Sequence, residues 1–435
     1  MNKNRDFEIL KYTITEIVIL CLFLTTIFWG FISKYLPFSK IIYQVIINIF
    51  DILPFIVFLV FGKIYIKKGQ KINSLFIIAN VLLFSFLLIF FTIINNGNFL
   101  DAILRLGVVF RFLPLCLLIL SLDNTYKLKI TSLFLKLVKY TFLIQLIIGV
   151  IQVIGGESAM KFFLPTVINE SSTSQGVTAL GEIFGTFANT IDYSFFLVAS
   201  FSILIAFKTI KLKSIFTPIV VFLTLSSGST AGFALTLISI YIFIETPNKK
   251  YLLTFAVVNF IILSFIYYSN FQPNLIELYS GLYNSRLGMI LFTLPEFLNT
   301  SVINGFFGLG ADKEVIYQIV SNFKNVPLIF IADQSVNALD DVYYVSTIIQ
   351  NGIVGLILLL YIFYKIFKNS LSLISKENIK IKKLLIFLFF MIASGSLFNQ
   401  ILHVRSFSLL FWITIGILSV SNKHFIKTKY ENTSN

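Results

Sequence analysis

Long apolar runs recur along nearly the whole chain, from residue 12 to residue 421. Each run is close to the ~20 residues that an α-helix needs to cross the hydrocarbon core of a bilayer. Of the 435 residues, 57% are hydrophobic and only 12% are charged, which leaves too little polar surface for a water-soluble protein of this length. The sequence therefore predicts an all-α polytopic membrane protein, with residues 1–435 forming a single integral membrane domain.

The runs divide into twelve predicted transmembrane spans. They cover residues 12–32, 41–62, 73–95, 100–122, 133–155, 191–208, 212–227, 231–246, 251–269, 342–366, 384–402 and 405–421. The seventh and eighth spans are short, and the turn-rich stretch from Ser226 to Gly232 joins them. This stretch is expected to form a full or a re-entrant hairpin, and in both cases the chain returns to the side that it left.

The basic residues indicate how the spans are oriented. One set of alternate connecting segments, which includes both termini, holds 25 of the 34 lysines and arginines, whereas the opposite loops hold six. Because short cytoplasmic loops are rich in these residues, both termini are predicted to be cytoplasmic. The same placement accounts for the net charge of +14, so no nucleic acid is expected as a partner.

Two predicted outer segments are longer than turns: a loop at 156–190 and a large loop at 270–341, between the ninth and tenth spans. Loops of this length in a compact protein usually carry a function. Both are rich in acidic residues, which the inner loops largely lack. The functional chemistry is therefore expected on the outer face, where there is no ATP and where an enzyme needs a substrate that is already activated.

Two arginines, Arg105 and Arg111, fall within the predicted fourth span. In a continuous helix a spacing of six residues would put them ~120° apart, on one broad side. Arginine stays charged, so each needs a partner or a watery cavity, and Asp51 and Glu16 are candidate partners. Either the arginines form ion pairs that hold helices in register, or one reaches a phosphate-bearing lipid, whose oxygens match a guanidinium group.

The last predicted outer turn contains His403 and Arg405. The histidine has either a structural or a direct role, and the arginine begins a span on the side where basic residues are scarce. The two cysteines, Cys21 and Cys116, lie inside apolar spans, and no cluster of residues has the spacing of metal ligands. No metal or other cofactor is expected.

Three short motifs stand out in the predicted outer segments. They are Gly185-Thr186-Phe187-Ala188-Asn189 before the sixth span, Asn284-Ser285-Arg286 followed by Asn304 to Gly310, and Asp340-Asp341-Val342-Tyr343-Tyr344 followed by Asn351 to Gly355. The paired aspartates are informative because a charge at a membrane boundary costs free energy. Each motif alone has little specificity, since glycines such as Gly308 and Gly310 also build ordinary turns.

In this order, within a chain of twelve spans, the motifs resemble the bacterial O-antigen and capsular polysaccharide polymerase family, which has an O-antigen ligase-like fold. The resemblance covers roughly residues 180–420. Asp341 stands eleven residues before Gly352, at the place of the family's histidine or aspartate. The hairpin after Ser229 has Thr230 where the family usually has an arginine, so another arginine would have to replace it. Aspartate in place of histidine favours a polymerase over a ligase.

The resemblance implies transfer of an undecaprenyl-pyrophosphate-linked glycan to the sugar hydroxyl of another lipid-linked repeat unit, on the outer face of the bacterial cytoplasmic (inner) membrane. Guanidinium groups would stabilise the charge that develops on the pyrophosphate, and a base would accept the hydroxyl proton. The implied residues are Asp341, with Asp340 in reserve, as catalytic base; Arg286, Arg105, Arg111 and Arg405 as pyrophosphate ligands; and Tyr343, Tyr344, Asn189 and His403 as substrate-binding residues.

Other interpretations remain open at this point. Asp341 is also a suitable N-cap for the tenth span, and Arg286 a partner for Glu277 or Glu296. A ligase of the same fold, or a lipid-linked oligosaccharide flippase or other transporter, would have a similar number of spans. The expected partners of a polymerase are the lipid-linked oligosaccharide, the lipid bilayer, and the chain-length regulator and flippase of the same pathway.

Overall fold

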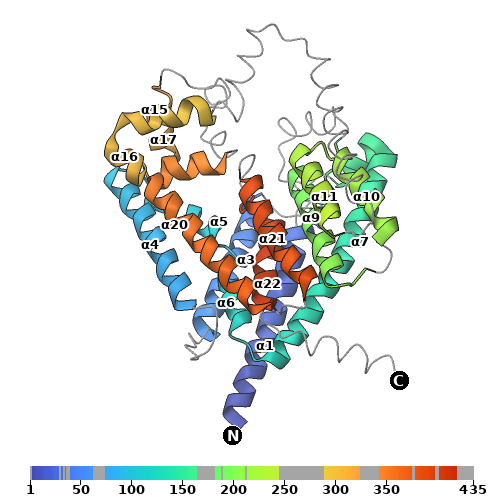
Figure 1. The fold of residues 1–435 in the computed structure, drawn as a ribbon. Helices are drawn as coiled ribbons and strands as arrows, with labels where there is room; N and C mark the ends of the chain where they lie inside the picture. The colour runs from blue at the N-terminus through green and yellow to red at the C-terminus, as the bar shows by residue number, and fades with distance from the viewer. Residues whose placement is uncertain are drawn as a thin grey trace, which may run out of the picture.

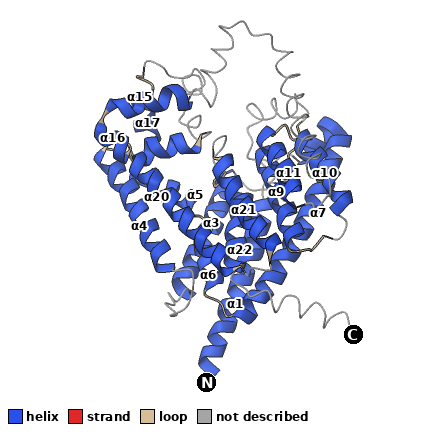
Figure 2. Ribbon diagram, viewed as in Figure 1, coloured by secondary structure: helices blue, strands red, loops and turns tan. Residues whose placement is uncertain are grey.

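A computed structural model of the chain describes residues 2–28, 31–32, 35, 40–61, 74–163, 182–187, 190–210, 213–243, 289–323, 342–374, 378–396 and 401–418. All the regular secondary structure in these ranges is helical (Figure 2). The predicted all-α class is therefore confirmed for the part of the chain that the structure describes.

The N-terminal helices are α1 (Asn2–Phe23), η1 (Leu24–Phe28), α3 (Lys40–Phe61), α4 (Ser74–Ile94), α5 (Phe99–Val109), α6 (Leu113–Leu120) and α7 (Asn124–Phe163). The middle of the chain forms α9 (Thr190–Ala206), α10 (Lys213–Ser226), α11 (Thr230–Phe243), η2 (Met289–Thr293), α15 (Leu294–Thr300), α16 (Val302–Phe307) and α17 (Lys313–Val320). The C-terminal helices are α20 (Tyr343–Leu373), α21 (Ile379–Gly395) and α22 (Arg405–Ile417).

The predicted spans overlap described helices, apart from 251–269, which lies outside the described residues, but their ends differ. Helix α7 continues to Phe163, so the start of the predicted outer loop 156–190 is helical, and that boundary is wrong. Within the range 100–122, however, α5 and α6 are separate helices bent by 48°. Arg111 lies in the break between them, so the expectation that Arg105 and Arg111 share one helix surface is wrong. Pro114, in the first turn of α6, lacks an N–H and favours a helix start at this point.

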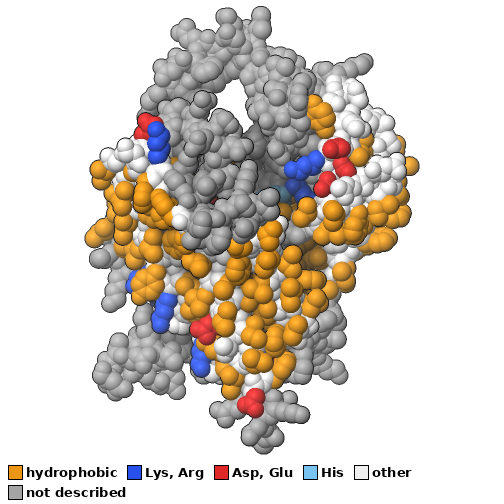
Figure 3. All heavy atoms as spheres, turned by 180° about the vertical axis from the view of Figure 1, so that it is seen from behind, with side chains coloured by type: hydrophobic (Ala, Val, Ile, Leu, Met, Phe, Trp, Pro, Cys, Tyr) orange, Lys and Arg blue, Asp and Glu red, His pale blue; other side chains and the backbone are white. Residues whose placement is uncertain are grey.

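Three described helices, α4, α7 and α20, are long and apolar enough to cross a membrane, and the bent pair α5–α6 would make a fourth. Large apolar side chains on these helices are exposed, and Ile154 reaches 80%. Figure 3 shows hydrophobic side chains spread in a belt over one face, with charged groups toward its margins. Such a surface indicates a membrane protein, because it would be costly in water.

Helix α22 forms the centre of the fold, and its side chains from Ser406 to Ile417 are buried. It packs against α6 and α9, and in Figure 1 it lies among the other helices rather than at the edge. Gly416 allows the close approach to α6, because a Cβ there would lie 3.0 Å from the Cβ of Ile119. Because α22 is buried from Ser406 onward, Arg405, its first residue, lies in the interior of the protein.

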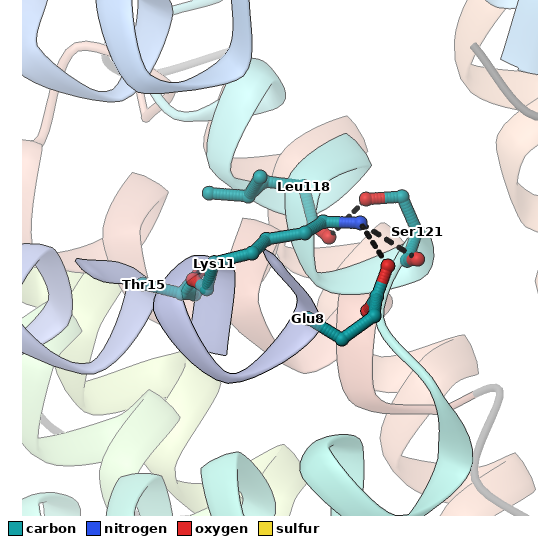
Figure 4. Close-up of polar contacts among 5 residues, drawn as sticks. All are labelled: Glu8, Lys11, Thr15, Leu118 and Ser121. Atoms are coloured by element: carbon teal, nitrogen blue, oxygen red, sulfur yellow. Dashed lines mark hydrogen bonds and ion pairs between the residues drawn. The ribbon is translucent and has the colours of Figure 1, made fainter. Parts of the chain in front are cut away.

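The Lys11 side chain of α1 binds to the C-terminal end of α6 (Figure 4). The side chain is fully buried, and Nζ donates a hydrogen bond to the carbonyl oxygen of Ser121 (2.9 Å) and lies 3.8 Å from Glu8 Oε1. A lysine at this position satisfies a carbonyl that the ending helix leaves free and opposes the helix dipole. Lys11 thus has a packing role besides its place among the basic residues of the N-terminal segment.

The predicted turn between the seventh and eighth spans is confirmed. Helix α10 ends at Ser226 and α11 begins at Thr230, with Gly228 in the left-handed region (φ +68°). The two helices pack against each other as a hairpin. A Cβ on Gly228 would lie 2.1 Å from Glu182 Oε1. The turn therefore also favours glycine because the Glu182 side chain packs against it.

Part of the predicted large outer loop is helical. Residues 289–323 form η2, α15, α16 and α17, which enclose a small core with the start of α20. This core is separate from the main one and contains Met289, Phe297, Leu309, Ile316, Val320, Val342, Val345, Ile348 and Ile349. The segment is therefore a packed unit mounted on α20 (Figure 1).

Candidate functional site

Two arginines from different parts of the chain converge on one carboxylate. Arg111 Nε lies 3.2 Å from Asp51 Oδ2, and Arg405 Nη2 lies 2.8 Å from Asp51 Oδ1. All three side chains are largely buried, with exposed fractions of 13%, 18% and 13% for Arg111, Asp51 and Arg405. The expected pairing of an intramembrane arginine with Asp51 is confirmed for Arg111, and Arg405 is an additional partner.

The third arginine and a histidine lie close to this triad. Arg105 Nη2 donates a hydrogen bond to Ser346 Oγ (2.9 Å), near the start of α20. His403 packs edge-on against the Tyr343 ring, with 5.9 Å between the ring centroids. Burial, followed by the positive charges of Arg105, Arg111 and Lys313, lowers the pKa of His403 well below 6.5. The described charges that act on the imidazole are thus cations.

We name Asp51, Arg105, Arg111, His403 and Arg405 the cationic cluster. Its members come from α3, α5, the α5–α6 break, the turn before α22, and α22 itself. Partly buried guanidinium groups interact strongly with anions, because the local dielectric constant is below that of water. The arrangement suits an oxyanion such as a phosphate, which can be bound by two nitrogens of one guanidinium group.

The second and third sequence motifs interlock beside this cluster. Leu309 N donates to Ile349 O (2.8 Å), and Gly310 N donates to Gln350 O (2.9 Å). Gly352, at φ +67°, breaks the regular helix of α20, and a Cβ there would lie 2.1 Å from Phe306 O. The glycines of both motifs therefore serve one backbone-to-backbone contact, which explains why they occur together.

Residues at the end of α4 hold the other side of the Gly308–Gly310 loop. Thr92 Oγ1 accepts a hydrogen bond from Ala311 N (2.9 Å), and Asn95 Nδ2 donates to Leu309 O (3.1 Å). Asp312 caps α17 and accepts a further bond from Asn98 N. The loop is consequently fixed between α4 and the break in α20, about one helical turn along α20 from Ser346, which Arg105 contacts.

Two glutamines of α7 hold the Gly185-Thr186-Phe187 motif. Gln152 Oε1 accepts from Phe184 N (3.1 Å) and Gly185 N (2.8 Å), and Gln152 Nε2 donates to Gly185 O (2.8 Å). Gln145 Nε2 donates to Thr186 Oγ1 (2.7 Å), and its Oε1 accepts from Thr186 N (3.1 Å). Both glutamines are completely buried, so these hydrogen bonds take the place of contacts with water for the loop backbone.

Replacing Gln152 with leucine should destabilise the protein by about 2–4 kcal/mol, since two N–H groups and one carbonyl lose their partner. Gln152→Glu keeps the acceptor oxygen but buries a carboxylate against the carbonyl oxygen of Gly185, so it should also destabilise the protein. The measurement is the thermal midpoint of the detergent-purified protein, with Gln318→Leu on the exposed side of α17 as control. Equal midpoints for Gln152→Leu and the control would contradict the proposed role of Gln152.

The two tyrosines predicted to contact sugars make packing contacts here. Tyr343 is 3% exposed, its backbone N–H donates to Ser396 O (3.1 Å), and its ring lies against His403. Tyr344 donates from its hydroxyl to Ala393 O (2.9 Å). These contacts fix the start of α20 on the end of α21. A role in sugar binding stays a prediction.

Several predicted site residues lie outside the described residues: Asp340, Asp341, Arg286 and Asn189. Their roles stay predictions. The described part of α20 begins at Tyr343 with Val342 as its N-cap residue, so the structure assigns the cap position to Val342 rather than to Asp341. The side chain of Thr230 is likewise outside the description, although its backbone starts α11.

Sequence reasoning missed Ser346, Gln145 and Gln152. The glutamines left a signal: they are seven residues apart in an apolar run, which puts them on one face of a helix. Ser346 left no comparable signal, because its contact with Arg105 joins residues 241 positions apart. Among the described residues, no group of three or more His, Cys, Asp or Glu side chains has the arrangement of a metal site.

The fold and the site define a helical protein with membrane-spanning capacity and a partly buried cationic cluster next to an interlocked pair of glycine motifs. No protein-family model, curated protein or solved structure matches the chain.

Proposed function

We propose that the chain is a membrane polysaccharide polymerase with twelve spans and cytoplasmic termini. It transfers a glycan from undecaprenyl pyrophosphate to the sugar hydroxyl of another lipid-linked repeat unit, on the outer face of a bacterial cytoplasmic membrane. The observation that carries the proposal is that Arg111 and Arg405 meet on Asp51, while Arg105 bonds Ser346 near the start of α20. His403, on which the charges of Arg105 and Arg111 act, packs against Tyr343 at the same helix start. The helix begins two residues after Asp341, the predicted base.

The reaction breaks the bond between the anomeric carbon and the pyrophosphate oxygen and forms a bond from that carbon to the acceptor oxygen. The hydroxyl proton passes to Asp341, and the bond electrons remain on the pyrophosphate. Arginines against the leaving group lower the barrier because they bind it more strongly as its charge grows. The three clustered arginines would supply the charge that the family usually places at the position of Thr230.

Deleting the gene in the source bacterium and analysing the surface glycan tests this function. A polymerase deletion leaves single repeat units on the carrier or the surface. A ligase deletion leaves long polymer on undecaprenyl pyrophosphate, and a flippase deletion traps single units on the cytoplasmic side. Either of the latter results, or an unchanged glycan, would reject the polymerase.

Asp341→Ala and Arg286→Ala, expressed in the deletion strain, should each abolish polymer while the protein remains in the membrane. The first removes the base and the second a pyrophosphate ligand, and removal of one such group typically costs ~100-fold or more in rate. Polymer length is read on a gel and protein amount by immunoblot of membranes, with Lys161→Ala, an exposed basic residue, as control. Polymer of normal length from either variant would remove that residue from the proposal.

A further inference from the structure

His403 occupies an unusual position within the cationic cluster. It lies in the turn between α21 and α22, outside both helices. Its Nε2 atom is buried and has no hydrogen-bond partner among the described residues. A buried polar atom without a partner costs ~1–3 kcal/mol, so its presence calls for a physical explanation.

Charged groups surround this imidazole from several elements. The charges that act on it are Arg105 on α5, Arg111 in the α5–α6 break and Lys313 on α17. Arg405 follows two residues along the chain and pairs, like Arg111, with Asp51 on α3. The Tyr343 ring of α20 covers a further side. Burial, and then the positive charges of Arg105, Arg111 and Lys313, oppose protonation of His403 and hold its pKa below the usual value.

We propose that His403 takes up a proton when a phosphate-bearing ligand occupies the cationic cluster, and that it then donates a hydrogen bond from Nε2 to a phosphate oxygen. The proton comes from solvent, and no covalent bond is made or broken. A multivalent oxyanion offsets the positive charges that, together with burial, oppose protonation of the imidazole, and it gives the unpartnered nitrogen an acceptor. The identity of the ligand as a lipid-linked diphosphate rests on the proposed function, whereas the binding chemistry is that of any multivalent oxyanion.

The direction of the pH dependence follows from linkage. The occupied site binds more protons than the empty site, so its affinity for the anion rises as the pH falls. The increase in anion affinity is complete below the pKa of His403 in the empty site. It is lost above the pKa of His403 in the occupied site. Each unit between those two values corresponds to a tenfold change in affinity.

Nuclear magnetic resonance of the imidazole nitrogens tests the proposal directly. The chain has two histidines, so the His424→Gln variant leaves His403 as the sole source of signal. The full-length protein is labelled with nitrogen-15 histidine, and the probe is sulfate, which remains dianionic throughout the range in which histidine titrates. Added sulfate should move the titration of His403 to higher pH, whereas the same ionic strength of chloride should not.

A binding measurement gives an independent readout. Sulfate affinity should rise by about tenfold or more as the pH falls through the transition, and His403→Gln should bind with an affinity that does not change with pH. Three results would overturn the proposal: no sulfate binding, a His403 titration that sulfate leaves in place, or an unchanged pH dependence in His403→Gln. Because sulfate is not a glycan, these results do not depend on the deletion experiment, which alone decides whether the chain is a polymerase.

Discussion

Polymer formation should fall at least ~100-fold in Arg405→Gln, because a guanidinium group aimed at a developing negative charge is worth ~3 kcal/mol or more of barrier. Arg405 Nη2 lies 2.8 Å from Asp51 Oδ1, at the buried start of α22. The assay is polymer length in the deletion strain, with membrane protein level measured in parallel. Arg405→Lys keeps the charge but loses the planar fork, and it should give an intermediate result.

A double variant separates a role in substrate binding from simple neutralisation of Asp51. Removing one partner of a largely buried ion pair costs ~3–5 kcal/mol, since the other charge is left behind. Asp51, however, still pairs with Arg111 at 3.2 Å in Arg405→Gln, so the protein level should stay near that of the wild type while polymer is lost, and the double variant Asp51→Asn, Arg405→Gln should also make no polymer. If the double variant made polymer of normal length, Arg405 would be only a counter-ion, and its assignment to the pyrophosphate would be wrong.

Gly352→Ala should reduce both the stability and the activity of the protein. The residue has φ +67°, where side chains other than glycine are strained, and a Cβ would approach the backbone of Phe306 to 2.1 Å. Since backbone atoms cannot rotate away as a side chain can, α16 would have to separate from α20, at a cost on the order of 3 kcal/mol. In Gly308→Ala the added Cβ would meet the backbone of Gln350, from the α16 side of the same contact. This variant should therefore also lose stability and activity.

The matched control is Gly107→Ala in α5, where an added Cβ would meet nothing within 4 Å. Alanine there should stabilise the helix by up to ~1 kcal/mol. Thermal midpoints of the three detergent-purified variants are compared by size-exclusion chromatography with fluorescence detection. A midpoint for Gly352→Ala equal to that of Gly107→Ala would show that the interlock of the two motifs does not carry the stability assigned to it.

The apolar runs determined where the described helices lie outside residues 289–323, because a run of ~20 apolar residues is stable in lipid only if its backbone bonds are satisfied within the segment. The turn at Gly228 was also marked in the sequence by glycine, whereas the break at Gly352 falls inside the predicted span 342–366, for which no break was expected. Pro114 marks the break in the fourth predicted span, but the apolar run continues through it, so the prediction gave Arg105 and Arg111 one helix that they do not share.

Only the tertiary structure decided which helix faces meet. In a chain of this kind both the lipid-facing and the protein-facing sides are apolar, so periodicity does not identify the packed side. Asp51, Arg111 and Arg405 are brought together because α3, α6 and α22 pack at the centre of the fold. The sequence by itself thus determined a helical chain with buried charges, and the packing of its helices determined that those charges form one cluster.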